Sequence, residues 1–146
     1  MGFLDSLVGE EGKGPEKDVP KKSGSQIPFR LSSSFIPLRL TAQKANSVNV
    51  VLKLRNITDD KQLVSIDILL PREKLLGFDP ACISKSIEKR VGEVGPGQTV
   101  EVSVPIWANN QTAAGDYPMN ITAYAHYQDY NKVYASVNKL ISLRAV

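Results

Sequence analysis

The chain has 146 residues, of which 42% are hydrophobic, so it is long enough to bury one core but not two. Its 18 basic and 15 acidic residues give a net charge of +3, and opposite charges are interspersed along most of the length. This mild excess does not indicate a nucleic-acid partner. The single cysteine, Cys82, excludes an intrachain disulfide and a four-thiolate metal site.

The first 28 residues differ in composition from the rest of the chain. Residues 9–26 are rich in Gly, Lys, Glu and Pro and hold one aliphatic side chain, Val19, which is typical of a flexible tether. Ahead of them, four apolar residues recur at helical spacing, namely Phe3, Leu4, Leu7 and Val8. This stub is a frayed terminus, a docking peptide for a partner or a weak membrane anchor. We therefore predict a flexible N-terminal tail, 1–28, with a short amphipathic stub.

The sequence indicates neither export nor a membrane span. The residues after Met1 lack a basic region followed by the ~7 to 15 apolar residues of a signal peptide. The longest apolar run is Ile68-Leu69-Leu70-Pro71, far short of the ~20 residues that cross a bilayer. We expect a cytoplasmic protein, with peripheral membrane association as the only membrane contact.

From Phe29 onward, apolar residues alternate with polar ones, and β-branched residues are frequent between turn-forming residues. This pattern predicts strands rather than helices. We expect seven of them, over residues 35–40, 47–56, 62–70, 86–94, 98–108, 117–128 and 132–145. Seven strands at this spacing predict an all-β fold, an immunoglobulin-like antiparallel β-sandwich over residues 29–146.

The same alternation predicts which side chains face the core. Even-numbered residues are expected inward in the strand from residue 98, and odd-numbered ones in the last two strands, from Tyr117 to Tyr127 and from Val133 onward. The connecting loop, 129–131, would place Asn131 in the left-handed conformation. Lys139 interrupts the inward set, and we expect it near the end of the sheet or beside a bulge.

Several motifs follow one another in a recognisable order: Leu54-Arg55-Asn56-Ile57-Thr58, then Ile68-Leu69-Leu70-Pro71, then Val94-Gly95-Pro96-Gly97-Gln98-Thr99-Val100-Glu101-Val102-Ser103-Val104, then Ala114-Gly115-Asp116-Tyr117. This order resembles prokaryotic immunoglobulin-like accessory and adhesion domains, namely the CARDB type and the related domain appended to alpha-galactosidases. The resemblance spans residues 36 to 145. It implies the fold and, for function, a carbohydrate-binding or cell-surface-binding accessory role, but no catalytic activity.

No catalytic constellation stands out in the sequence. His126 is the only histidine, and nothing places it beside Cys82 as a base beside a thiol. Most acidic residues fall in turns or at outward strand positions, which is typical of solvated surface. The glycines of residues 92–97 lead into a strand without the Lys–Ser/Thr ending of a phosphate-binding loop. We therefore expect no catalytic residue, no metal site and no cofactor, and predict that the chain is not an enzyme.

One predicted sheet face is rich in side chains suited to binding. The expected register puts Tyr124 opposite Ser136 and His126 opposite Tyr134, with Thr122 opposite Asn138 and Tyr130 on the connecting loop. Tyr and His side chains supply contact area and hydrogen bonds at low entropic cost. Packing between neighbouring strands explains the same tyrosines without a partner.

These observations favour a non-catalytic module that binds another protein through a sheet face or edge. The predicted contact residues are Tyr124, His126, Tyr130 and Tyr134. Two alternatives remain open. One is binding of carbohydrate or a cell surface, and the other is a membrane-peripheral role through the apolar stub of residues 3–8.

Overall fold

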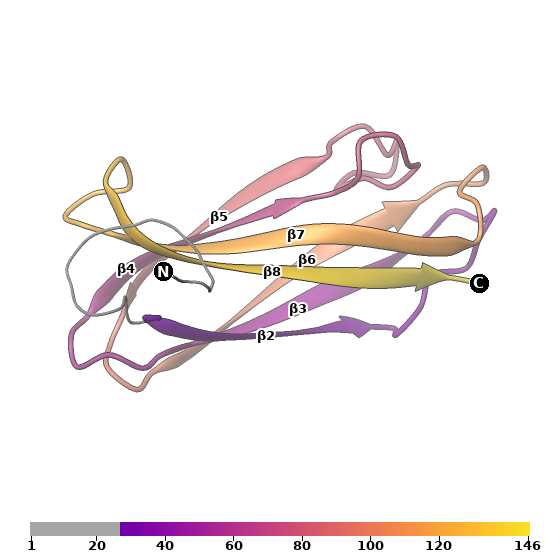
Figure 1. Ribbon diagram of the computed structural model, residues 1–146. Helices are drawn as coiled ribbons and strands as arrows, with labels where there is room; N and C mark the ends of the chain where they lie inside the picture. The colour runs from indigo at the N-terminus through magenta and orange to yellow at the C-terminus, as the bar shows by residue number, and fades with distance from the viewer. Residues whose placement is uncertain (1–26) are drawn as a thin grey trace, which may run out of the picture.

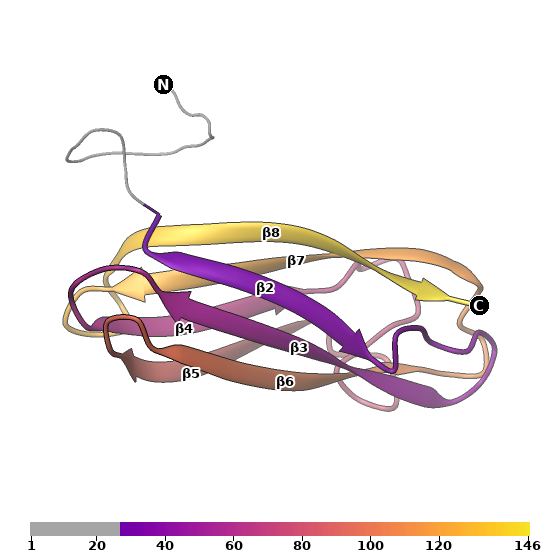
Figure 2. The same cartoon turned by 90° about the horizontal axis from the view of Figure 1, so that it is seen from below.

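The computed structural model describes residues 27–146, which form a sandwich of two antiparallel sheets (Figures 1 and 2). One sheet has the strand order β2-β3-β6 and the other the order β5-β4-β7-β8. The chain crosses between the sheets after β3, β5 and β6, which is the connectivity of an immunoglobulin-like sandwich and confirms the predicted fold class. The strands are β2 Phe29–Ile36, β3 Asn46–Asn56, β4 Gln62–Leu69, β5 Ser86–Val94, β6 Thr99–Ala108, β7 Gly115–His126 and β8 Val133–Ala145.

The predicted tail falls largely outside the part of the chain that the structure describes. The stub of Phe3, Leu4, Leu7 and Val8 and the glycine-rich segment after it lie outside residues 27–146, so the expectations for both stay predictions. Within residues 27–146 there is no helix that is long and apolar enough to span a membrane.

The core lies between the two sheets and takes alternate side chains from each. In β3 the even-numbered residues from Val48 to Leu54 are buried, and they face Ile66 and Ile68 of β4 and Ile121 of β7. Full burial of one such aliphatic side chain stabilises the fold by about 1.5–3 kcal/mol. The predicted inward set of β6 is confirmed, since Val104 and Ile106 are buried while Thr99 and Glu101 are exposed.

Six of the seven predicted strands lie within two residues of their predicted bounds, and the first is wrong. It was expected over residues 35–40, whereas β2 spans Phe29–Ile36 and pairs along its whole length with β3. The run Ser32-Ser33-Ser34 has little strand propensity of its own. Pairing with β3 and the packing of Phe29, Leu31 and Phe35 on the core hold the segment as a strand. Leu40 instead makes an isolated parallel bridge to Ala145.

Tyr117 fixes the corner where the chain enters β7. Its ring is buried, and its hydroxyl donates a hydrogen bond to the carbonyl oxygen of Ala113, four residues earlier, at 2.5 Å. A tyrosine bonded back to the backbone in this way is the tyrosine corner of immunoglobulin-like folds. The hydroxyl satisfies a carbonyl at the point where the chain changes sheets.

The turn between β7 and β8 differs from the prediction. A bulge between Ala125 and His126 shifts the register, so Val133 lies opposite His126 and is exposed rather than inward. Tyr127, which follows the end of β7, is also exposed rather than inward. Gln128, with φ of 71°, takes the left-handed conformation that was expected of Asn131. The expected parity is lost because the bulge adds one residue to one strand.

Candidate functional site on the four-stranded sheet

The outer face of the β5-β4-β7-β8 sheet carries polar and aromatic side chains in cross-strand rows. The register of the three strand pairs aligns residues that point away from the core, because their neighbours in β4, Ile66 and Ile68, are buried in it. The three rows are Ser86, Leu69, Asn120 and Leu140, then Glu88, Asp67, Thr122 and Asn138, then Arg90, Ser65, Tyr124 and Ser136.

Two polar residues on this outer face are buried. Ser65 is 2% exposed and His126 is 6% exposed. The Ser65 Oγ lies 2.7 Å from the His126 Nε2, which is a hydrogen bond. The other ring nitrogen, Nδ1, is buried and has no hydrogen-bond partner within the described residues. His126 thus lies on the predicted outer face but is buried rather than exposed, and its role as a contact residue stays a prediction.

Aromatic side chains cover the Ser65–His126 pair. Tyr130, from the loop between β7 and β8, meets the His126 ring edge-on, with 5.1 Å between ring centroids. The Tyr124 ring also lies near His126, with 6.2 Å between ring centroids. The guanidinium carbon of Arg90 lies 4.7 Å from the centroid of the Tyr130 ring, within the range of a cation–π interaction. The loop is therefore folded over the sheet and held by a residue of β5.

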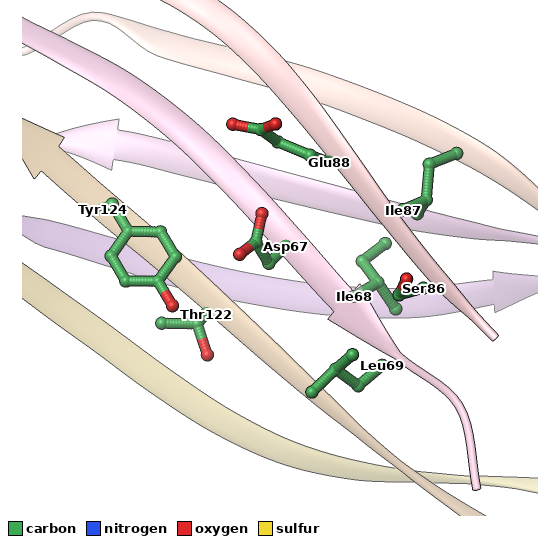
Figure 3. Close-up of a pocket in the computed structure, with 8 residues that line it drawn as sticks. All are labelled: Asp67, Ile68, Leu69, Ser86, Ile87, Glu88, Thr122 and Tyr124. Atoms are coloured by element: carbon green, nitrogen blue, oxygen red, sulfur yellow. The ribbon is translucent and has the colours of Figure 1, made fainter. Parts of the chain in front are cut away.

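Beside this cluster lies an open hollow of about 390 Å³ (Figure 3). The carboxylates of Asp67 and Glu88 and the Tyr124 ring project on this side of the sheet. Leu69, which is 52% exposed, lies at one end of it. The hollow is lined by Asp67, Ile68, Leu69, Ser86, Ile87, Glu88, Thr122 and Tyr124.

The ionisable groups of the hollow are shifted by their surroundings. Burial, and then the charge of Glu88, raise the pKa of the Asp67 carboxyl. Burial, and then the charge of Asp67, likewise raise the pKa of the Tyr124 hydroxyl. Both shifts favour the uncharged forms of these two side chains.

Of the predicted contact residues, Tyr124, His126 and Tyr130 lie together and Tyr134 does not. The Tyr134 hydroxyl instead donates a hydrogen bond to the Gln62 Oε1. Gln62 begins β4 and is buried, as are the other even-numbered residues of that strand, which face the core. The predicted pairs of Tyr124 with Ser136 and Thr122 with Asn138 are confirmed, whereas His126 lies opposite Val133 instead of Tyr134. The bulge at His126 accounts for this shift.

Three residues of this face were not singled out from the sequence, namely Ser65, Leu69 and Arg90. They come from β4 and β5, which sequence reasoning did not place beside β7. The signal that could have found them is the outward parity of Ser65 and Asp67 between Val64, Ile66 and Ile68. Asp67 and Glu88 had been interpreted as solvated surface.

Cys82 does not add a reactive group to the outer face of the four-stranded sheet. Cys82 is buried, with its Sγ 3.4 Å from the carbonyl oxygen of Trp107, and burial raises the pKa of its thiol. A raised pKa disfavours the thiolate that nucleophilic attack requires. Within residues 27–146 no group of three or more His, Cys, Asp or Glu side chains is arranged to hold a metal ion.

The fold is similar to domains of several solved proteins. The segment of Escherichia coli alpha-2-macroglobulin from domain MG7 to the C-terminus matches with a TM-score of 0.55 and 18% identity, over 82% of this chain and 17% of that one. The C-terminal domain of wzt matches with a TM-score of 0.53 and 12% identity, over 83% of this chain and 75% of that one. AvmM, which catalyses macrocyclization in alchivemycin A biosynthesis, matches with a TM-score of 0.51 and 9% identity, over 82% and 89%.

No protein-family model and no curated protein matches the chain. The narrower resemblance to CARDB-type domains therefore stays a prediction. At the identities given above, the solved structures show the fold alone, and one of them is an enzyme. The immunoglobulin-like sandwich is thus established by the strand connectivity and by these matches, while function has to be argued from the residues on its surface.

Proposed function

We propose that the chain is a non-catalytic module that binds a partner protein through the outer face of its four-stranded sheet. The observation that carries this proposal is the cluster in which Tyr130 is held between Arg90 and His126, beside the hollow of Figure 3. A solvent-facing sheet surface needs no such cover over a buried serine and histidine. A rigid aromatic and arginine centre is what protein-binding surfaces use as anchors.

The apolar surroundings of the cluster support the same proposal. Leu69 and Leu140 lie in one cross-strand row and are 52% and 68% exposed. Polar residues follow in the next rows, among them Asn138, which donates to the Thr122 Oγ1 at 2.8 Å. Exposed aliphatic side chains next to a polar rim are typical of a protein interface.

The Ser65–His126 pair speaks against hydrolytic catalysis at this face. A serine nucleophile must reach its substrate, and its histidine must be oriented by an acceptor at the second ring nitrogen. Here Ser65 is covered, and the His126 Nδ1 has no acceptor within residues 27–146. The pair therefore serves packing and hydrogen bonding beneath Tyr124 and Tyr130.

Protein is favoured over carbohydrate as the ligand. A sugar ring stacks on an open aromatic face, whereas Arg90 lies over the Tyr130 ring and His126 lies against it. The same face also exposes two aliphatic side chains, Leu69 and Leu140, which suit contact with apolar side chains of a protein.

Site-specific photocrosslinking in cells tests this function. A benzophenone amino acid is placed at Leu69 or Leu140 of the full chain, and at exposed Lys53 or Ser103 of the other sheet as controls. We expect one protein to be crosslinked from the first two positions and not from the controls. Equal capture from both sheets, or no protein from either, would contradict the proposal.

The captured partner then allows a quantitative test. Tyr130→Ala should weaken its binding by about tenfold or more, because the centre of the face is lost. Tyr127→Ala is the matched control, since Tyr127 lies in the same loop and is exposed. Isothermal titration measures both affinities, and an equal effect of the two substitutions would contradict the assignment of this face.

A further inference from the structure

Among residues 27–146, β8 is the last strand of its sheet, and backbone groups along part of its outer edge have no hydrogen-bond partner. At the C-terminal end of β8 the edge is paired with Leu40. The Leu40 N–H donates a hydrogen bond to the Arg144 carbonyl oxygen at 2.9 Å, and the Val146 N–H donates one to the Leu40 carbonyl oxygen at 3.0 Å. Edge-facing groups recur at every second residue, so those of Ser142, Leu140, Asn138 and Ser136 point the same way as those of Arg144. Such an edge is a template for another extended chain.

An apolar strip runs along this free edge. β8 and β2 lie side by side where the two sheets meet (Figures 1 and 2). Val137 and Ile141 of β8 and Leu31 and Phe35 of β2 are partly buried side chains packed on the core. A strand added to β8 would place every second side chain over this strip, because side chains alternate between the two faces of a sheet.

Lys139 lies within this strip, between Val137 and Ile141 on the same side of β8, and is only partly exposed. Its Nζ donates one long hydrogen bond, 3.4 Å, to the Leu31 carbonyl oxygen. Within residues 27–146 it forms no ion pair, whereas Arg90 and Arg144 each have an acidic partner. A partly buried cation without a counter-charge is unfavourable, so a carboxylate brought to this point would be stabilising. This position also corrects the expectation for Lys139, which lies in the middle of an edge strand, away from the bulge.

We propose that the free edge of β8 takes up an extended segment of a partner protein by strand addition. The segment carries an acidic side chain facing Lys139 and an apolar side chain two residues to either side. This inference rests on the proposed function, because it presumes a protein partner, but it concerns the edge rather than the face. A second copy fits poorly, because antiparallel pairing of two β8 strands centred on this strip would bring two Lys139 side chains together.

Titration of the ¹⁵N-labelled full chain with synthetic peptides tests the inference. The probe is a short peptide of alternating Val and Thr with Asp at its central inward position, and the matched control has Lys there. We expect the Asp peptide to bind about tenfold or more tightly than the Lys peptide. The amides of Ser136, Asn138, Leu140 and Ser142 should shift and exchange more slowly. Lys139→Glu should reverse the preference, and Lys139→Gln should abolish it.

Three outcomes would overturn the inference. Equal binding of the two peptides, or no binding, would show that Lys139 selects nothing. Binding of the Asp peptide only after Asp5→Lys would make the chain's own residues 3–7 the occupant, since Phe3, Asp5 and Leu7 carry the same sequence pattern. Changes confined to β5 or β6 would place the site at another edge. The function proposed above fails separately, because Tyr130→Ala tests the face and Lys139→Glu tests the edge.

Discussion

Ser65 and His126 are hydrogen-bonded at 2.7 Å on the side of the sheet that faces away from the core, and both are nevertheless buried. The outer face thus contains two buried polar side chains, which lie beneath Tyr124 and Tyr130. Buried polar groups are costly unless they are paired, and Ser65 provides the single partner of the imidazole within residues 27–146.

The first prediction concerns this pair. Ser65→Ala leaves both ring nitrogens of His126 buried and unpaired, so the free energy of unfolding should fall by about 1–3 kcal/mol. The double substitution Ser65→Ala with His126→Phe removes both polar groups and should recover most of that loss. Urea denaturation followed by Trp107 fluorescence measures both. If the double variant is as unstable as Ser65→Ala, the hydrogen bond is not the cause.

The second prediction concerns the hollow and has a defined pH dependence. Burial and the charge of Glu88 raise the pKa of the Asp67 carboxyl above its usual value. The protonated carboxyl therefore contributes stability that is fully present below the unfolded-state pKa and is lost as the pH rises through the folded-state pKa. Asp67→Asn should therefore be more stable than the wild type at neutral pH, and the difference should vanish in acid, below a pH of about 3.

Asp79 provides a control of opposite sign for that experiment. Hydrogen bonds from the backbone N–H groups of Ser84 and Ile83 lower the pKa of Asp79. Its contribution is present above the unfolded-state pKa and is lost as the pH falls through the folded-state value. Asp79→Asn should thus be less stable than the wild type at neutral pH, with the difference again vanishing in acid. If both variants shift in the same direction, one of the two assignments is wrong.

The third prediction concerns the corner before β7. Tyr117→Phe keeps the buried ring but removes the hydrogen bond to the Ala113 carbonyl, which should cost about 1 kcal/mol of unfolding free energy. Tyr127→Phe, at an exposed tyrosine, should change stability by less than about 0.5 kcal/mol. Thermal and urea unfolding compare the two. Equal effects would mean that the Tyr117 hydroxyl is dispensable.

The fourth prediction concerns the loop between β4 and β5. A Cβ atom on Gly77 would lie 2.4 Å from the Cys82 Cα and 2.7 Å from its carbonyl carbon, and neither backbone atom can move alone. Gly77→Ala should destabilise the fold by about 1–3 kcal/mol or more. Gly95→Ala is the control, because there the nearest atom, the Gln98 Oε1 at 3.4 Å, ends a flexible side chain. Similar unfolding midpoints for the two variants would contradict this close approach.

Local alternation was sufficient to predict most strands and the core face, because side-chain direction in a strand is set by parity alone. Ser86–Val94 coincides with its predicted bounds, and Val104 and Ile106 are buried as expected. β2 was misplaced because its three consecutive serines give no apolar signal, and its pairing partner lies in β3. Parity also failed at Val133, since a bulge cannot be seen in alternation, and at Tyr127, which lies beyond the end of β7.

The candidate site was only partly predictable. Tyr124 and Tyr130 were identified because β7 and β8 are neighbours in sequence. His126 was expected to be exposed, and its burial depends on Ser65 in β4 and on the cover formed by Tyr124 and Tyr130. Arg90, in β5, holds Tyr130 in turn. Such contacts between distant strands depend on sheet order, which a single sequence does not reveal.

The clamping of Tyr130 between Arg90 and His126 has a consequence for how fast and how tightly a partner associates. A hairpin loop that moves freely must be ordered on binding, which weakens the complex. Here the Tyr130 ring is already held in place by Arg90 and His126, so the proposed partner would associate largely by rigid-body docking. Substituting Arg90 would release the ring, and its main effect would be a shorter lifetime of the complex.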